Sequence, residues 1–393
     1  MSLIPGLWRP ILICCGALEL LSASCNRASN HVVPISFQDQ FSVATPHDRY
    51  ADDLGRFLAG LPARGGSPFS ELQNQPVWAK HRQELDRAWS GMESSSLPAM
   101  RAFQRQELAA VAIPQSPVLY PFSGPDALMV TTFFPASPVY VMVGLEPAGT
   151  LPDPRQLGRK DLEKYLASVR ATLASELSRS FFITREMDRE FRGQVTDGLF
   201  LPILELLVRS QHTILGFRYV RLSDRGRVVE RPAESIAPGK NGNKGVEIEF
   251  LRDDDQSVHK LLYLSVNLSD KSLRENQSFL AFLNTLEGTA TLLKATSYMT
   301  HRPEFSIIRQ LLLASSAAVL QDDSGIPYHF FDERSWRVQL YGGYVRPYGS
   351  FRWLEQADLR NAYLSSRAKS LNFRIGYGYG RIPSNLLLAR KVN

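Results

Sequence analysis

The sequence predicts an α+β fold with a helix-rich N-terminal half and an antiparallel or mixed sheet with packed helices in the C-terminal half. Three observations support this prediction. Apolar residues recur at helical spacing through much of the first half, and they alternate at strand spacing in several segments after residue 215. Helices and strands also occur in blocks without strict alternation, which favours α+β over a doubly wound parallel sheet.

The first half is predicted to be mainly helical. Helical spacing begins at Pro46 and covers residues 47–61 and 78–92, with glycines and prolines between these segments. Residues 138–147 form a short, nearly continuous apolar run bounded by prolines, which is typical of a buried strand. Consecutive helices are expected over residues 159–177, 181–191 and 198–215.

The second half changes to a period of two. Strands are expected within residues 216–230, around an Asp-Arg-Gly turn, and within residues 245–268, around an acidic turn. Helical spacing returns over residues 278–295 and 304–320. The end of the chain is predicted to form strands over residues 336–345, 371–380 and 386–392.

The N-terminus indicates export. Residues 1–24 combine one arginine, a short apolar run and the small residues Ser22, Ala23 and Ser24, as in a signal peptide. The run is shorter than the roughly 20 apolar residues of a membrane-spanning helix. Cys25 follows directly and is a candidate for lipidation, with simple removal of the segment as the alternative. We therefore predict a periplasmic, secreted or lipid-anchored protein.

The rest of the chain is predicted to be a polar tether, residues 25–45, and a single large α+β unit, residues 46–393. Residues 232–245 are rich in glycine, proline and charge, and they divide this unit into two lobes or form a long hairpin loop.

Composition excludes several classes of function. All three cysteines lie within the first 25 residues, so the mature chain has no zinc–cysteine site, cysteine nucleophile or internal disulfide. The net charge of +6 arises from 45 basic and 39 acidic residues without long runs of one sign, so no nucleic-acid partner is predicted. The seven histidines are isolated from one another, and we predict no metal site from their spacing.

Two loops contain the candidate site residues. The segment "YPFSGPD", residues 120–126, and the segment "DDSGIPYHFF", residues 322–331, both combine aromatic, serine-glycine, proline and aspartate residues. Glu146 ends the predicted buried strand. We propose Asp322 or Asp323 as a candidate catalytic base and Glu146 as a candidate acid, and the candidate ligand-binding residues are Tyr120, Ser123, Asp126, Ser324, Tyr328 and His329.

These residues also have other interpretations. Asp-Asp-Ser-Gly is favourable turn chemistry, so taken alone this stretch favours Asp322 and Asp323 as residues that brace a turn. A carboxylate cluster would also suit a hard cation. The aromatic residues near the C-terminus favour core packing, with a sugar-stacking platform as the alternative, and they are Trp336, Tyr341, Tyr344, Tyr348 and Trp353.

Six motifs resemble those of a family of exported bacterial proteins of no assigned function. They are "YPFSGPD" (120–126), "TFFP" (132–135), "YVMVGLEP" (140–147), "SYMTH" (297–301), "QDDSGIPYHFF" (321–331) and "YGGY" (341–344). The resemblance covers about residues 117 to 380. It implies that these loops belong to one unit, and it implies no activity.

Three functions follow as hypotheses. The first is a cell-envelope protein with a polar cleft that binds a small polar molecule or glycan. The second is a cofactor-free hydrolase of envelope polysaccharide that uses paired carboxylates, and the third is a structural partner in an envelope complex. Phosphate-binding loops, serine-nucleophile elbows and zinc helices are absent from the sequence, which identifies no cofactor.

Overall fold

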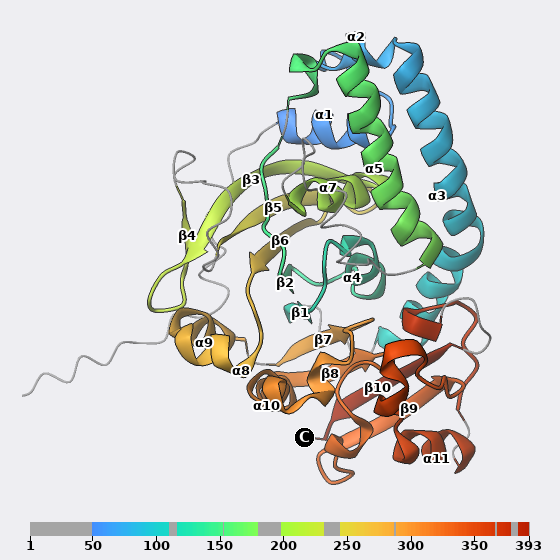
Figure 1. The fold of residues 1–393 in the computed structure, drawn as a ribbon, viewed down its shortest axis with the longest axis vertical. Helices are drawn as coiled ribbons and strands as arrows, with labels where there is room; N and C mark the ends of the chain where they lie inside the picture. Colours follow the sequence, from blue (N-terminus) through green and yellow to red (C-terminus); the bar gives the residue numbers. More distant parts are fainter. Residues whose placement is uncertain are drawn as a thin grey trace, which may run out of the picture. The chain divides into compact units, whose positions relative to one another are not determined.

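A mixed sheet runs through the protein (Figure 1). The computed structural model describes residues 49–109, 116–151, 153–179, 198–231, 244–286, 288–365, 368–378 and 384–392. The predicted signal peptide, the tether and Cys25 lie outside these residues. The strands are β1 (Val118–Pro121), β2 (Val139–Gly144), β3 (His212–Leu222), β4 (Val228–Glu230), β5 (Lys244–Arg252), β6 (Val258–Ser265), β7 (Thr289–Leu293), β8 (Ser316–Gln321), β9 (Trp336–Gly342) and β10 (Asn385–Lys391).

The described strands form one ten-stranded sheet in the order β4-β3-β5-β6-β2-β1-β7-β8-β10-β9. The five central strands, from β6 to β8, are parallel to one another. Antiparallel strands extend the sheet at both ends, with β5, β3 and β4 beyond β6 and with β10 and β9 beyond β8. The predicted α+β class with a mixed sheet is confirmed.

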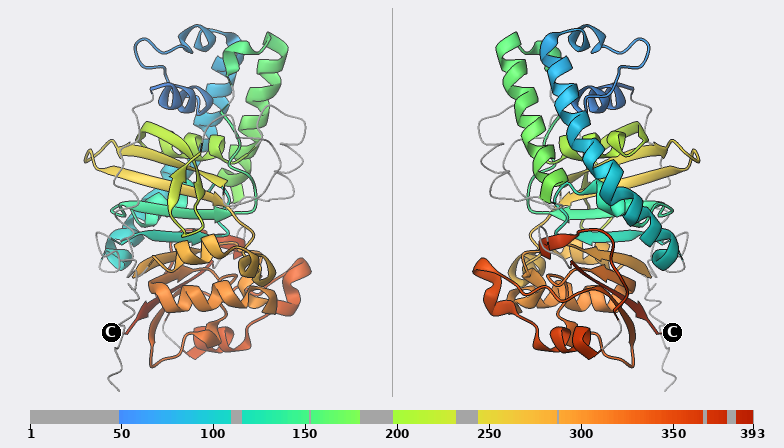
Figure 2. Two further views of the ribbon diagram at one scale, coloured as in Figure 1. Left: turned by 90° about the vertical axis from the view of Figure 1, so that its left-hand side faces the viewer. Right: turned by 90° about the vertical axis from the view of Figure 1, so that its right-hand side faces the viewer.

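Helices cover both faces of the sheet (Figure 2). The α-helices are α1 (Arg49–Leu58), α2 (Ser70–Gln73), α3 (Pro76–Phe103), α4 (Ala127–Phe133), α5 (Arg159–Arg179), α7 (Phe200–Arg209), α8 (Asp270–Glu275), α9 (Gln277–Leu283), α10 (Ser306–Ser315) and α11 (Ala357–Ser365). Helices α3, α4 and α7 share one hydrophobic core with the sheet, and α8 to α11 share the core on the opposite face.

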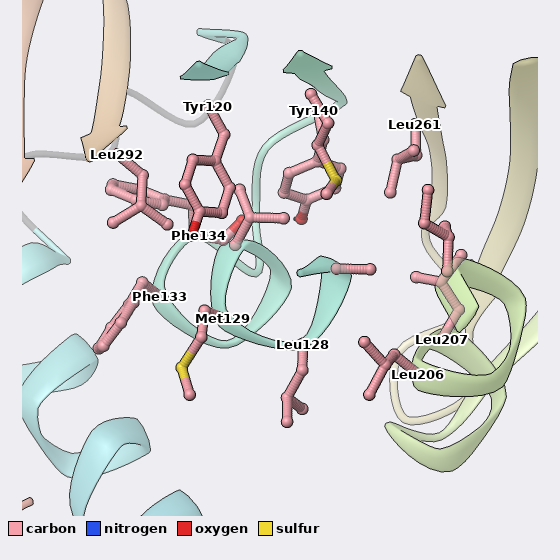
Figure 3. Close-up of a cluster of buried hydrophobic side chains, with 14 of the residues drawn as sticks. Tyr120, Leu128, Met129, Phe133, Phe134, Tyr140, Leu206, Leu207, Leu261 and Leu292 are labelled. Atoms are coloured by element: carbon pink, nitrogen blue, oxygen red, sulfur yellow. The ribbon is translucent and has the colours of Figure 1, made fainter. Parts of the chain in front are cut away.

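Strand alternation explains the two cores. In β1, Val118 and Tyr120 contribute to the core under α4, whereas Leu119 contributes to the core on the other face. Figure 3 shows the first core, in which side chains of α4 and α7 face those of β1, β2 and β6. All residues of α7 are buried, because a third apolar cluster from α1, α3 and α5 covers the side of α7 turned away from the sheet.

Several sequence-based element predictions are wrong in one consistent way. The helix expected over residues 198–215 ends at Arg209, and β3 begins at His212. The helices expected over 278–295 and 304–320 contain α9 and α10, but their second halves are the strands β7 and β8. These two strands are short and lie in the middle of the sheet, so their sequences carry almost no period-two signal.

The other predicted helices and strands have mixed outcomes. Residues 371–378 form a loop with a short 3-10 turn in place of the expected strand, and the helix expected over 181–191 lies outside the described residues. The strands expected around residues 138–147, 216–230, 245–268, 336–345 and 386–392 are confirmed. No helix in the described part of the chain is long and apolar enough to cross a membrane.

Two buried histidines give the fold a predictable sensitivity to acid. Burial lowers the pKa of His81 and of His212 to about 4, from 6.5. Their rings form hydrogen bonds with the carbonyl oxygens of Leu58 at 2.7 Å and Leu207 at 3.0 Å. Because the unfolded state takes up these protons near pH 6.5 and the native state only near pH 4, each histidine removes up to about 3 kcal/mol of stability as the pH falls between those values.

Urea unfolding of His81→Gln at several pH values tests this expectation. The variant should be less stable than the wild type at pH 7, because the buried hydrogen bonds change, but its stability should depend less on pH between 6.5 and 4. His329→Gln alters an exposed ring and is the control. A pH dependence of His81→Gln identical to that of the wild type would contradict the assignment.

Candidate functional site

The candidate site lies at the carboxyl-terminal ends of β1, β7 and β8. Helix α4 connects β1 to β2 on one face of the sheet, whereas α8 and α9 connect β6 to β7 on the other face. The chain therefore turns in opposite directions on the two sides of the β1–β7 pair. In sheets wound in this way, ligands bind outside the carboxyl ends of the strands at that switch point.

A buried ion pair lies at this point. The Nζ atom of Lys294, directly after β7, is 2.5 Å from Oδ2 of Asp126, which follows β1. Tyr120 donates a hydrogen bond to the same oxygen at 2.8 Å, and the amide of Met129 donates to Oδ1 at 3.3 Å. Asp126 thus caps α4 and forms an ion pair with Lys294. The side chains of Asp126 and Lys294 are almost completely buried.

Asp322 accepts hydrogen bonds from the loops after β7 and β8. Its Oδ2 accepts from the amide of Ala295 at 2.9 Å, and its Oδ1 accepts from the amide and hydroxyl of Ser324 at 2.9 and 2.5 Å. Burial raises the pKa of Asp322, and these hydrogen bonds and the charge of Lys294 oppose that rise. The hydrogen bonds and the lysine charge favour the charged form of Asp322, and burial disfavours it.

Asp323 holds its proton to a higher pH than an ordinary aspartate does. Tyr298 donates to its Oδ2, and Asn385 of β10 donates to its Oδ1 at 3.0 Å while accepting from its amide at 2.8 Å. Burial, followed by the charge of Asp322, raises the pKa of Asp323 to about 7. A pKa near 7 leaves the Asp323 carboxyl group about half protonated at pH 7.

Backbone strain is concentrated in the same loops. Ala295, Ser297 and Tyr298 follow β7 with φ values of 50°, 54° and 53°, and Phe122 follows β1 with a φ of 59°. Left-handed conformations cost free energy in residues other than glycine, and they accumulate at functional sites more often than elsewhere. Four such residues at the ends of two neighbouring strands therefore strengthen the case for a site here.

Gly376 shows how tightly the cluster is closed. A Cβ atom at this position would lie 1.8 Å from Oδ2 of Asp322, and the φ of Gly376 is +59°. The next residue, Tyr377, accepts a hydrogen bond from the amide of Ser297 and donates one to the carbonyl of Ala295. The loop that contains Gly376 therefore packs directly on the strained loop after β7.

The segment of residues 344–356 covers the carboxylates. The Phe351 ring lies 5.0 Å from that of Tyr298 and 5.6 Å from that of Tyr377. Gln356 donates to the carbonyl of Asp323 at 2.9 Å and accepts from the amide of Tyr328 at 2.8 Å. We refer to residues 344–356 as the covering segment.

The covering segment forms a pocket. Its volume is about 280 Å³, and it is lined by Arg346, Pro347, Tyr348 and Arg352. Trp353, the next residue, is 69% exposed, and Tyr348 is 50% exposed. The aromatic residues near the C-terminus therefore divide into two groups, because Trp336 and Tyr341 are buried core residues.

The structure brings together part of the predicted site. Asp126, Asp322, Asp323, Ser324 and Tyr120 lie in one buried polar cluster linked through the loop after β7. The buried Ser123 hydroxyl donates to the carbonyl oxygens of Gly124 and Val143 and so holds the loop after β1 to β2. These side chains are at most 5% exposed and do not line an open cleft.

Glu146, Tyr328 and His329 lie outside this cluster. Glu146 follows β2, which is separated from β8 by β1 and β7. Three inter-strand steps of about 4.8 Å separate β2 from β8 by roughly 14 Å, which is more than the roughly 5 to 9.5 Å between the two carboxyl groups of glycoside hydrolases. Tyr328 is half-buried beneath Gln356. The His329 ring is exposed, 3.8 Å from the carboxylate of Asp358.

Sequence reasoning missed the groups that hold the cluster together. Lys294 was assigned to a helix, although it directly follows a short buried strand, where a lysine is unusual enough to be a signal. Tyr298 lies within the "SYMTH" motif, but its role was not anticipated. Asn385 and Tyr377 gave no signal, because they reach the aspartates only through the fold.

The chemistry available to the cluster is limited by its own contacts. Within the described residues, no group of three or more histidine, cysteine, aspartate or glutamate side chains could hold a metal ion.

Comparison of the chain with protein-family models, curated proteins and solved structures found no match. The structure therefore defines the chain as an α+β protein with a parallel centre to its sheet and a closed polar cluster at the switch point.

Proposed function

We propose that this protein is an exported bacterial envelope protein that binds a polar small molecule or glycan without turnover. The observation that carries the proposal is the pocket on the covering segment, which is lined by two arginines and a half-exposed tyrosine. An aromatic face packs against a sugar ring, and arginines donate hydrogen bonds to its oxygens. The apolar N-terminal segment and the cysteine-free remainder of the chain support export.

The buried cluster supports binding more than hydrolysis. The carboxylate of Asp322 accepts three hydrogen bonds, and that of Asp323 accepts two. These hydrogen bonds occupy both carboxylates, and Glu146 follows β2, which β1 and β7 separate from β8. In this proposal the cluster is a support, because Gln356 and Phe351 hold the pocket-bearing segment against it.

A fluorescence titration tests the proposal. Trp353 is exposed and directly follows Arg352 of the pocket, so its emission should change in a saturable way when a ligand binds. The probes are N-acetylglucosamine oligosaccharides and soluble fragments released from bacterial cell-wall glycan by a muramidase. Tyr348→Ala should weaken the binding of any active fragment about tenfold, which corresponds to about 1.4 kcal/mol.

Leu364→Ala, which shortens an exposed side chain on α11, is the control and should bind as the wild type does. Both variants alter exposed side chains, so both should melt with the wild type. The proposal is wrong if no fragment of the panel gives a saturable change, or if Tyr348→Ala binds the active fragment as tightly as the wild type.

A further inference from the structure

Positive charge is concentrated and oriented around the pocket. Glu355 accepts hydrogen bonds from Nε of Arg346 at 2.8 Å and from Nη1 of Arg360 at 2.9 Å. One carboxylate therefore holds two guanidinium groups in place. Within the described part of the chain, Arg346 has no other hydrogen bond or ion pair, so its two terminal nitrogens have no protein partner.

Arg352 adds a second cation to the same pocket. It is exposed, and it makes no hydrogen bond or ion pair with any other described residue. Among the described residues, Arg346 and Arg360 pair with Glu355, and Arg352 lines the pocket with Arg346 without an acidic partner. The nearby Asp358 does not line the pocket and lies 3.8 Å from His329. An excess of oriented guanidinium groups favours an anion, because each can donate two parallel hydrogen bonds to a carboxylate.

On the basis of the proposed function, we propose that the ligand of this pocket is an acidic sugar. Its ring would pack on Tyr348, and its carboxylate would receive hydrogen bonds from the terminal nitrogens of Arg346 and from Arg352. The pocket volume of about 280 Å³ suits a single sugar residue. Glu355 and Arg360 are positioning residues, because they fix the direction of Arg346 without lining the pocket.

The test compares two probes that differ only in charge. One is the disaccharide of N-acetylglucosamine and N-acetylmuramic acid, which carries a lactyl carboxylate, and the other is the same disaccharide with this carboxylate converted to its amide. Trp353 fluorescence should show that the wild type binds the acid at least tenfold more tightly than the amide. The preference should decrease at high salt, because screening weakens exposed charge interactions.

Two variants separate charge from geometry. Arg352→Ala should lose much of the preference for the acid and keep only the part that Arg346 supplies. Arg352→Lys should keep more of the preference, since lysine retains the charge but loses the paired donors. Arg352 is exposed and makes no hydrogen bond or ion pair with another described residue, so both variants should melt with the wild type.

The outcomes distinguish this inference from the proposed function. Equal binding of acid and amide by the wild type overturns the inference and leaves the proposed function standing, provided that Tyr348→Ala weakens both. Failure of the acid to bind, while neutral fragments bind, also overturns only the inference. Failure of every fragment in the panel overturns both.

Discussion

Replacing Lys294 with methionine is expected to lower the free energy of unfolding by about 3 to 5 kcal/mol, because it leaves the buried carboxylate of Asp126 without its cation. Both side chains of this pair are almost fully buried, so water cannot replace the lost partner. Methionine has a similar length, which limits the contribution of a cavity. Urea unfolding at pH 7 measures the loss.

A double variant shows whether the charge is the cause. Asp126→Asn combined with Lys294→Met removes both charges and retains an amide oxygen that can accept from Tyr120, so it should be more stable than Lys294→Met alone. Lys164→Met is the control, because Lys164 forms an exposed pair with Asp161 at 3.7 Å, and its effect should stay below about 1 kcal/mol. Equal losses from Lys294→Met and Lys164→Met would refute the role of the buried pair.

Asp323→Asn is expected to gain stability relative to the wild type as the pH rises from about 4 to 8. The folded pKa of Asp323 is about 7, above its ordinary value of 3.8, so the native state holds this proton more tightly than the unfolded state does. The resulting stability is fully present below pH 3.8 and is lost as the pH rises through 7. The wild type loses up to about 4 kcal/mol of stability in this way. Asparagine does not titrate, so the variant does not have this loss.

The comparison must be made as a difference between variant and wild type at each pH, because the buried histidines change the stability of both proteins in the opposite direction. A constant offset is expected from the altered hydrogen bonds with Tyr298 and Asn385. Asp322→Asn is the matched variant. It should be less stable than the wild type at neutral pH, because the carboxylate that it replaces accepts three hydrogen bonds. A difference between Asp323→Asn and the wild type that does not vary with pH would show that folding does not raise the pKa of Asp323.

Much of the fold could be predicted where one face of a strand is more exposed than the other. Strands β3 and β4 alternate between buried and exposed positions, and their hairpin was predicted from period and turn chemistry. In contrast, every residue of β7 is buried, and β8 has one half-buried residue. Such strands look like the continuation of the helices before them, so the parallel centre of the sheet was not anticipated.

The candidate site, like the fold, could be predicted only in part from the sequence. The sequence placed Asp322 and Asp323 at a turn where the chain leaves an apolar segment, and the structure has that turn at the end of β8. It also paired this segment with "YPFSGPD", which follows β1 in the same parallel group. The proposed partnership with Glu146 could not be judged, because the distance between two loops depends on the order of the strands.

The sequence by itself determined the α+β class, the turn chemistry at Asp322 to Gly325, the apolar N-terminal segment and the absence of cysteine beyond residue 25. These properties depend on composition and on neighbours along the chain. Only the tertiary structure decided that Lys294 meets Asp126 and that Asn385 meets Asp323. Their contacts require strands from distant parts of the chain to lie side by side, and local propensity and burial do not specify that order.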